Sequence, residues 1–249
     1  MTNILLVHGG WHGSWCWTKF ADRLHDSGHQ VRAVQLRGHD RPPGRIWYRV
    51  HDYVEDVERA VASFGTPPIL VGHSLGGLIV QKYLERHRAP GAVLMASIPP
   101  GGTIAAVARL LRRHPILFLR ATLLLRLKPF VATRRLVREL FFTPDTPSTI
   151  VNMCFECLQD ESYLAFIDTM LILPCPRRVR TAILVLGAER DAFFTVAEVR
   201  GTARAYGIEA EIFPNIGHDM MLDSGWRLVA DRIGEWIRER ERAQLGQST

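Results

Sequence analysis

The sequence predicts an α/β fold in which about six mainly parallel strands carry helices on both faces and a helical segment is inserted. Six short apolar or β-branched runs, most of which end in or next to glycine or a polar residue, are spread along the 249 residues. Amphipathic helical patterns separate them, and strands that alternate with helices are typical of βαβ units and a parallel sheet. The third observation is that this alternation stops between Pro99 and Pro176.

The predicted strands are nearly continuous apolar runs, which are typical of a parallel sheet that is covered on both faces. They lie at residues 3–10, 29–36, 68–74, 91–97, 181–188 and 209–215. The helical patterns cover residues 17–28, 50–65, 78–89 and 196–207, and a last helix covers residues 226–243.

The stretch from 99 to 176 is helix-like throughout and is punctuated by prolines. We expect it to form a helical lid over a core made of residues 1–98 and 177–249. Nine basic residues and one acid lie between 101 and 140, a net charge of +8 in a chain whose total is +6. Pro115 argues against one straight helix in this stretch.

Two interpretations of this basic, leucine-rich lid stay open. The first is an ordinary cap with leucines inward and arginines in water, which we favour because charge runs are usually solvated faces. The second is a surface that contacts an anionic lipid surface or a long-chain acyl substrate. A nucleic-acid partner is not expected, because no nucleic-acid motif accompanies the charge.

Composition favours a soluble, cytoplasmic protein. The N-terminus runs into the first predicted strand with no basic leader or cleavage site. The longest apolar stretch is interrupted by Arg120, Arg126 and Lys128, which makes it a poor membrane span. Cys154 and Cys157 form a C-x-x-C inside a helical pattern, and no further ligand pattern completes a metal site. We therefore expect neither a metal nor a cofactor.

The chemistry is predicted by the stretch GHSLGG at residues 72–77, which follows an apolar strand and precedes a helix. Gly72-His73-Ser74-Leu75-Gly76 fits G-x-S-x-G, the pattern that places a serine on a sharp strand-to-helix turn. The two flanking glycines remove side chains that would obstruct this turn. Ser74 is therefore the predicted nucleophile.

A serine hydroxyl needs a base, and the expected chain order is serine, acid, histidine. Asp191 lies just past the strand at 181–188, and His218 lies in the loop before the last helix. We predict that His218 accepts the proton of Ser74 and that Asp191 holds the imidazole. Glu189 is an alternative acid, and Asp219 is interpreted as a cap of the following turn.

Acyl transfer also needs donors for the developing oxyanion. The backbone N–H of Leu75 is one candidate, and the loop HGGWHGSW after the first strand should supply the other. We assign this second donor to Gly10, with Trp11 as the neighbouring alternative. Trp11 is also a candidate to line the substrate pocket.

Together these motifs resemble the α/β-hydrolase superfamily. They are HGG at 8–10, LRGHD at 36–40, GHSLGG at 72–77, LGAERD at 186–191 and IGHDMM at 216–221. The opening HGGWHGSWCW is similar to the methylesterase and hydroxynitrile-lyase branch. The lyases of that branch carry a threonine where Gly9 stands and a lysine where Asp219 stands, so the resemblance implies ester hydrolysis and not cyanohydrin cleavage.

The predicted function is a carboxylesterase-like serine hydrolase that acts on a small-molecule or acyl-chain ester through an acyl-enzyme. A thioesterase or a C–C bond hydrolase could use the same three residues. A non-catalytic, ligand-binding protein of this fold is a further alternative. The sequence leaves the natural substrate and the oligomeric state open.

Overall fold

The computed structural model describes residues 1–39 and 47–246, and its centre is one six-stranded parallel sheet in the order β2-β1-β3-β4-β5-β6. The strands are β1 (Asn3–Val7), β2 (Gln30–Val34), β3 (Ile69–His73), β4 (Ala92–Met95), β5 (Ile183–Ala188) and β6 (Ala210–Phe213). Each begins within two residues of a predicted run, so the predicted number of strands and their parallel direction are confirmed.

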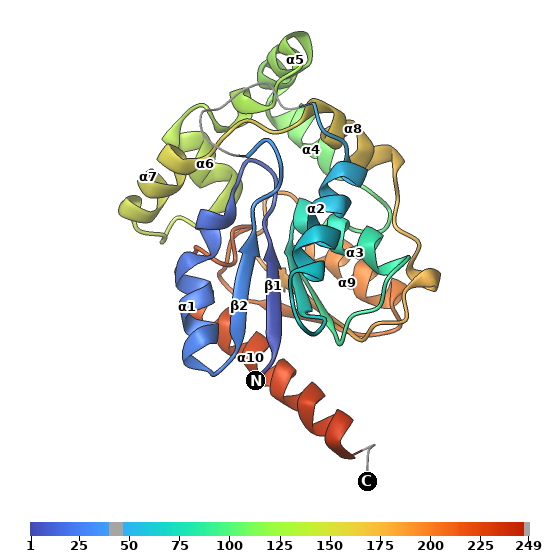
Figure 1. The fold of residues 1–249 in the computed structure, drawn as a ribbon. Helices are drawn as coiled ribbons and strands as arrows, with labels where there is room; N and C mark the ends of the chain where they lie inside the picture. Colours follow the sequence, from blue (N-terminus) through green and yellow to red (C-terminus); the bar gives the residue numbers. More distant parts are fainter. Residues whose placement is uncertain (40–46, 247–249) are drawn as a thin grey trace.

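Helices cover both faces of the sheet (Figure 1). The bounds of those on one face are α1 (Thr18–Asp26) and α10 (Trp226–Gly246), and those on the other are α2 (Val50–Ala62), α3 (Leu75–Leu84) and α9 (Val196–Ala205). Successive side chains of a strand point to opposite faces. Accordingly, Ile4 and Leu6 of β1 belong to the core under α1 and α10, whereas Leu5 and Val7 belong to the core under α2 and α3.

Five helices lie between β4 and β5 and sit over the edge of the sheet where the strands end (Figure 1). They are α4 (Ile104–Arg113), α5 (Pro115–Leu124), α6 (Arg134–Phe141), α7 (Ser148–Cys157) and α8 (Tyr163–Leu171). Short 3₁₀ turns lie at Ser14–Trp17 (η1), Lys128–Val131 (η2) and Pro176–Arg178 (η3). Pro115 does break the chain into two helices, as predicted. The division into core and lid stays a prediction.

The favoured interpretation of the lid, with its leucines inward, is wrong for α5. Ile116 is 73% exposed and Leu123 is 74% exposed, and Ala121 is the one buried residue of this helix. The physical reason is that α5 packs along a narrow strip against α4 and η2 and projects from the top of the molecule (Figure 1). Among the described helices, none is long and apolar enough to span a membrane.

Candidate active site

Ser74 occupies a strained turn between β3 and α3. Its φ of 52° and ψ of −115° lie in a region that non-glycine residues rarely adopt. A side chain at Gly72 would place its Cβ 2.5 Å from the carbonyl oxygen of Gly76. One at Gly76 would overlap the carbonyl oxygens of Val7 and His8. Glycine at both positions therefore makes this turn sterically accessible.

Two backbone amides near Ser74 are available as donors. In the part of the chain that the structure describes, neither the Leu75 N–H nor the Gly10 N–H donates to another residue. The loop after β1 also approaches the serine closely, since a Cβ on Gly9 would lie 3.0 Å from the Cβ of Ser74. Gly10, Leu75 and Ser74 all line one cavity. This is where the sequence placed the oxyanion donors.

His218 and Asp191 are paired. The Nδ1 of His218 lies 2.9 Å from Oδ2 of Asp191, and both side chains are buried. The other carboxylate oxygen of Asp191 accepts from the amides of Phe193 and Phe194 at 2.7 and 3.0 Å. Because a carboxylate only accepts, Nδ1 of His218 donates to Asp191. The alternative acid, Glu189, instead accepts from the amide of Asn215.

Ser74 and His218 line the same cavity, but no hydrogen bond joins them among the described residues. Such bonds are often long in the absence of substrate and tighten when it binds. The structure therefore brings the predicted nucleophile and base to one cavity wall, and it joins the predicted base to the predicted acid.

His73, inside the turn, supports the backbone of His218. Its Nε2 donates to the carbonyl oxygen of His218 at 2.9 Å. Burial, reinforced by the nearby ring of His218, lowers the pKa of His73 to about 3. His73 is therefore neutral near neutral pH. Its ring and that of Phe193 flank the His218 imidazole, with centroids 4.8 and 4.6 Å away.

The cavity wall is mostly apolar. The residues that line it come from the sheet edge, from helices α4, α6 and α8, and from the loops beside them. They include Ile98, Ala106, Val107, Leu110, Leu127, Phe141, Phe166, Phe193 and Phe194. Trp11 lines it too, as predicted from the sequence. Phe193 and Phe194 lie two and three residues after Asp191, and this closeness to the predicted acid is the signal that could have assigned them to the pocket.

Glu161 is a site residue that sequence reasoning missed. It lines the cavity, and its buried carboxylate accepts from Trp11 N–H at 3.2 Å, His39 Nε2 at 3.0 Å, Tyr53 Oη at 3.0 Å and Ser162 N–H at 2.6 Å. These contacts fix Trp11, which has a φ of 63°. Burial alone would raise the pKa of Glu161, but the pairing with His39 outweighs it and lowers that pKa. No local motif marks Glu161 in the sequence.

Asp219 does not cap the following turn, contrary to the sequence-based interpretation. Its Oδ2 lies 3.0 Å from Nε2 of His12, and the Nδ1 of His12 lies 2.8 Å from the carbonyl oxygen of Gly10. Both partners only accept, so His12 donates from both nitrogens and is an imidazolium. Although burial lowers the pKa of His12, the Asp219 carboxylate raises it by more. Asp223 instead binds the backbone on both sides of this turn, because it accepts from the amides of Gly217 and Ser224 at 2.8 and 2.6 Å.

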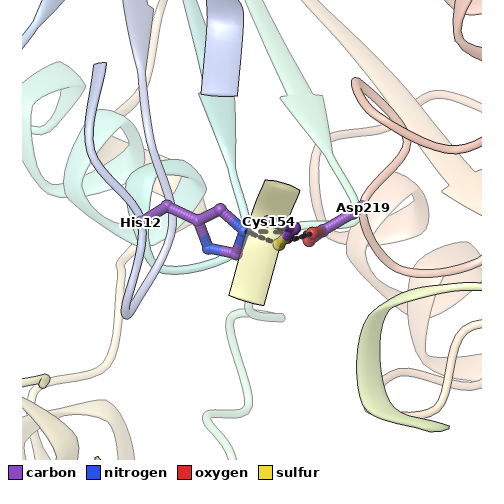
Figure 2. A group of neighbouring side chains, drawn as sticks. All are labelled: His12, Cys154 and Asp219. Carbon is purple, nitrogen blue, oxygen red and sulfur yellow. Dashed lines mark hydrogen bonds and ion pairs between the residues drawn. The ribbon is translucent and has the colours of Figure 1, made fainter. Parts of the chain in front are cut away.

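Cys154 completes a buried cluster with this pair (Figure 2). Its Sγ lies 4.0 Å from Nε2 of His12 and 3.9 Å from Oδ2 of Asp219. Nitrogen, sulfur and oxygen donors at such separations could hold a metal ion. However, Nε2 of His12 carries a proton in the ion pair, and burial raises the pKa of the Cys154 thiol well above its usual value. We therefore interpret the cluster as an ion pair with a neutral thiol beside it.

Comparisons with known proteins agree with this architecture. The model of the alpha/beta hydrolase family matches residues 4–232. The chain belongs to this family. The LRGHD motif at 36–40 lies within the match, although its last residue, Asp40, is outside the described residues.

Two plant proteins are similar to part of this α/β hydrolase. Methylesterase 9 of Arabidopsis thaliana is 38% identical over 82 residues, 31% of this chain and 32% of that protein. Methyl jasmonate esterase 1 of Vitis vinifera is 35% identical over 105 residues, 40% of each chain. The chain thus matches about a third to two fifths of the length of these curated relatives. The predicted resemblance to the methylesterase branch is confirmed.

Solved structures show the same fold at lower identity. A thermophilic esterase from Thermogutta terrifontis superposes with a TM-score of 0.73 at 19% identity, over 96% of this chain and 90% of that one. A crystal structure of polyneuridine aldehyde esterase gives a TM-score of 0.71 at 20% identity, over 93% and 97% of the two chains. These likenesses establish the α/β-hydrolase fold of this chain.

Proposed function

We propose that this α/β hydrolase cleaves uncharged carboxylic esters with apolar substituents through an acyl-enzyme on Ser74. One observation carries the proposal: the strained Ser74 shares an apolar cavity with His218, whose ring is held by Asp191. The names of the plant relatives, a methylesterase and a methyl jasmonate esterase, support the same reaction class.

In the first half of the reaction, the Ser74 oxygen attacks the ester carbonyl carbon. His218 Nε2 takes the hydroxyl proton, and Asp191 stabilises the imidazolium that forms. The carbonyl oxygen becomes an oxyanion that accepts from the N–H groups of Leu75 and Gly10. The bond to the alcohol oxygen then breaks, and His218 returns the proton to the departing alcohol.

The second half repeats these steps with water as the nucleophile. His218 removes a proton from water, and the resulting hydroxide attacks the acyl carbon on Ser74. Collapse of the intermediate breaks the bond to the Ser74 oxygen, which regains a proton from His218. The products are a carboxylic acid and free enzyme, so the chemistry draws on no group beyond those described.

The cavity wall supports a neutral, apolar substrate. Its lining is dominated by aliphatic and aromatic side chains, and no arginine or lysine belongs to it among the described residues. Its one acidic side chain, Glu161, already accepts from four donors, so it has little capacity left for a substrate group. The His12 imidazolium also lines the cavity, but both of its nitrogens are already bound by Asp219 and Gly10. An anionic acyl group would therefore be desolvated here without a free cationic partner, which is costly.

Ser74→Ala tests the nucleophile. We expect this variant to fold, to lose ester turnover and to lose covalent labelling by a fluorophosphonate. Ser97→Ala is the matched control, because Ser97 follows β4 as Ser74 follows β3 but donates its hydroxyl to the carbonyl oxygen of Ile98. Undiminished labelling of Ser74→Ala, or loss of labelling in Ser97→Ala alone, would overturn the assignment.

A substrate panel tests the reaction class. It comprises p-nitrophenyl esters of increasing acyl length, an acyl thioester and a vinylogous diketone. We expect turnover of the esters to exceed that of the other two classes, and a dicarboxylic monoester with a free carboxylate to be a poor substrate. A larger kcat/KM for the thioester or the diketone would contradict the ester assignment while leaving the role of Ser74 intact.

A further inference from the structure

The outer surface of α4 and α5 exposes an unusual number of aliphatic side chains. Seven of the fourteen large apolar residues that are exposed in the described chain lie in these two helices or directly after α5: Ile104, Leu111, Ile116, Leu119, Leu123, Leu124 and Leu125. We call this set the α4–α5 surface. A helix that is apolar around its circumference is normally buried in a core or a membrane. Most of the aliphatic side chains of α5 are instead exposed.

Cations accompany the aliphatic side chains. Arg112, Arg113 and Arg120 are exposed on the same two helices. Among the described residues, neither Arg112 nor Arg120 makes an ion pair. The one acid between residues 101 and 140, Glu139, is mostly buried and is held by Arg113 and His114. The α4–α5 surface therefore presents two arginines, Arg112 and Arg120, whose charge no ion pair offsets among the described residues.

We infer that the α4–α5 surface docks peripherally on an anionic lipid surface. Aliphatic side chains inserted among acyl chains, with arginines at the level of acidic headgroups, are the arrangement that favours interfacial binding. A protein partner is less well matched, because protein interfaces are enriched in aromatic residues and the exposed set is entirely leucine and isoleucine. Helix α5 lies at the top of the molecule, away from both termini (Figure 1).

This surface is continuous with the cavity through α4. Ala106, Val107 and Leu110 of that helix line the cavity, while Ile104 and Leu111 of the same helix are exposed. Docking would thus place the roof of the cavity against the lipid phase, where apolar esters concentrate. The inference itself needs only the surface, and it stands or falls separately from the proposed chemistry at Ser74.

Co-sedimentation with vesicles tests the inference on the full chain. We expect the protein to pellet with vesicles of phosphatidylcholine mixed with phosphatidylglycerol at low salt, and to pellet far less with phosphatidylcholine alone. Added salt should weaken the binding, because it screens the arginines. Equal pelleting with both vesicle types, or none with either, would overturn the inference. Repeating the assay with Ser74→Ala separates docking from turnover.

Two double variants locate the binding surface. Arg112→Gln/Arg120→Gln should weaken partitioning roughly 25-fold, since each arginine at an anionic surface contributes about fivefold. Its control is Arg86→Gln/Arg88→Gln, two exposed arginines beyond the end of α3 that make no ion pair among the described residues. Equal losses in the two arginine pairs would show non-specific charge attraction and would overturn the assignment to α4 and α5.

Ile116→Ser/Leu123→Ser should reduce partitioning at least about tenfold by removing two inserted aliphatic side chains. Its control is Leu228→Ser, because Leu228 is 66% exposed on α10 and should not contribute. Hydrolysis of a short, soluble p-nitrophenyl ester should be unchanged in both variants. If sedimentation velocity shows a dimer that only Ile116→Ser/Leu123→Ser dissociates, and vesicles do not bind, the surface is an interface with a second copy and the lipid inference fails.

Discussion

The ring of His12 and the carboxylate of Asp219 form a fully buried ion pair, with Nε2 and Oδ2 3.0 Å apart. The pair joins the loop after β1 to the loop that carries His218, across 207 positions of sequence. The other nitrogen of His12 holds the carbonyl of Gly10, whose amide we propose as an oxyanion donor. One ion pair therefore links the two loops that meet at the proposed site.

Asp219→Asn should destabilise the fold strongly. It leaves the His12 imidazolium buried without its counter-charge, and breaking a buried pair in this way costs about 3–5 kcal/mol. Urea unfolding followed by circular dichroism measures the loss. Asp231→Asn is the matched control, because Asp231 pairs with Arg23 on the surface and should cost much less. Equal losses in the two variants would contradict the importance of the buried pair.

The effect of Asp219→Asn should also depend on pH. Burial alone would raise the pKa of Asp219, but the charge of His12 outweighs it and lowers that pKa below its ordinary 3.8. Burial alone would lower the pKa of His12, but the Asp219 carboxylate raises it above its ordinary 6.5. The Asp219 contribution is complete above 3.8 and is lost as pH falls through its lowered pKa. The His12 contribution is complete below 6.5 and is lost as pH rises through its raised pKa. The difference from wild type should therefore be largest between pH 3.8 and 6.5.

Acid should destabilise the protein through His73. Its pKa is about 3 in the folded state against an ordinary 6.5, so the unfolded chain binds the extra proton between these values. The free energy of unfolding then falls by up to about 1.4 kcal/mol per pH unit from this group as pH drops below about 6.5. His73→Gln keeps a donor for the His218 carbonyl. It should reduce the pH dependence of the free energy of unfolding by up to about 1.4 kcal/mol per pH unit, the contribution of one proton. An unchanged slope would show that His73 is not buried as a neutral ring.

Asp191→Asn should reduce kcat by about 10⁴-fold while leaving folding intact, because an amide at this position stabilises the wrong tautomer of the histidine. Glu189→Gln is the control and should retain near wild-type turnover, since Glu189 contacts the amide of Asn215 and not His218. Steady-state kinetics on a p-nitrophenyl ester would decide between the two acids. A crippled Glu189→Gln with an active Asp191→Asn would reverse the assignment.

Removing metal ions should change nothing. Because Nε2 of His12 carries a proton toward Asp219, the cluster with Cys154 lacks the free nitrogen lone pair that a metal ion requires. Dialysis against a chelator should leave the melting temperature and ester turnover unchanged, and equilibrium dialysis should detect no stoichiometric zinc. One zinc ion per chain that Cys154→Ser abolishes would show that the cluster is a metal site.

The sequence was most informative where the structural cause is local. A buried parallel strand needs a run of apolar residues, and all six runs became strands. The turn at Ser74 needs glycine at 72 and 76 because their Cβ atoms would collide with nearby backbone, and that requirement is visible as a pattern. The meeting of His218 and Asp191 could be predicted because each follows a parallel strand, and parallel strands end at the same edge of a sheet.

Contacts across long stretches of chain were decided by the tertiary structure alone. Asp219 follows His218 in the sequence and was interpreted as a turn cap, but its partner is His12. Glu161 lies in a stretch without a motif, and its carboxylate binds the loop at Trp11. The leucines of α5 looked like core residues, yet the helix packs by one narrow strip. A sequence pattern records what each segment requires of its own backbone. The partner of a buried charge and the covering of an apolar helix face depend on how separate segments pack against one another. The sequence of one segment does not determine that packing.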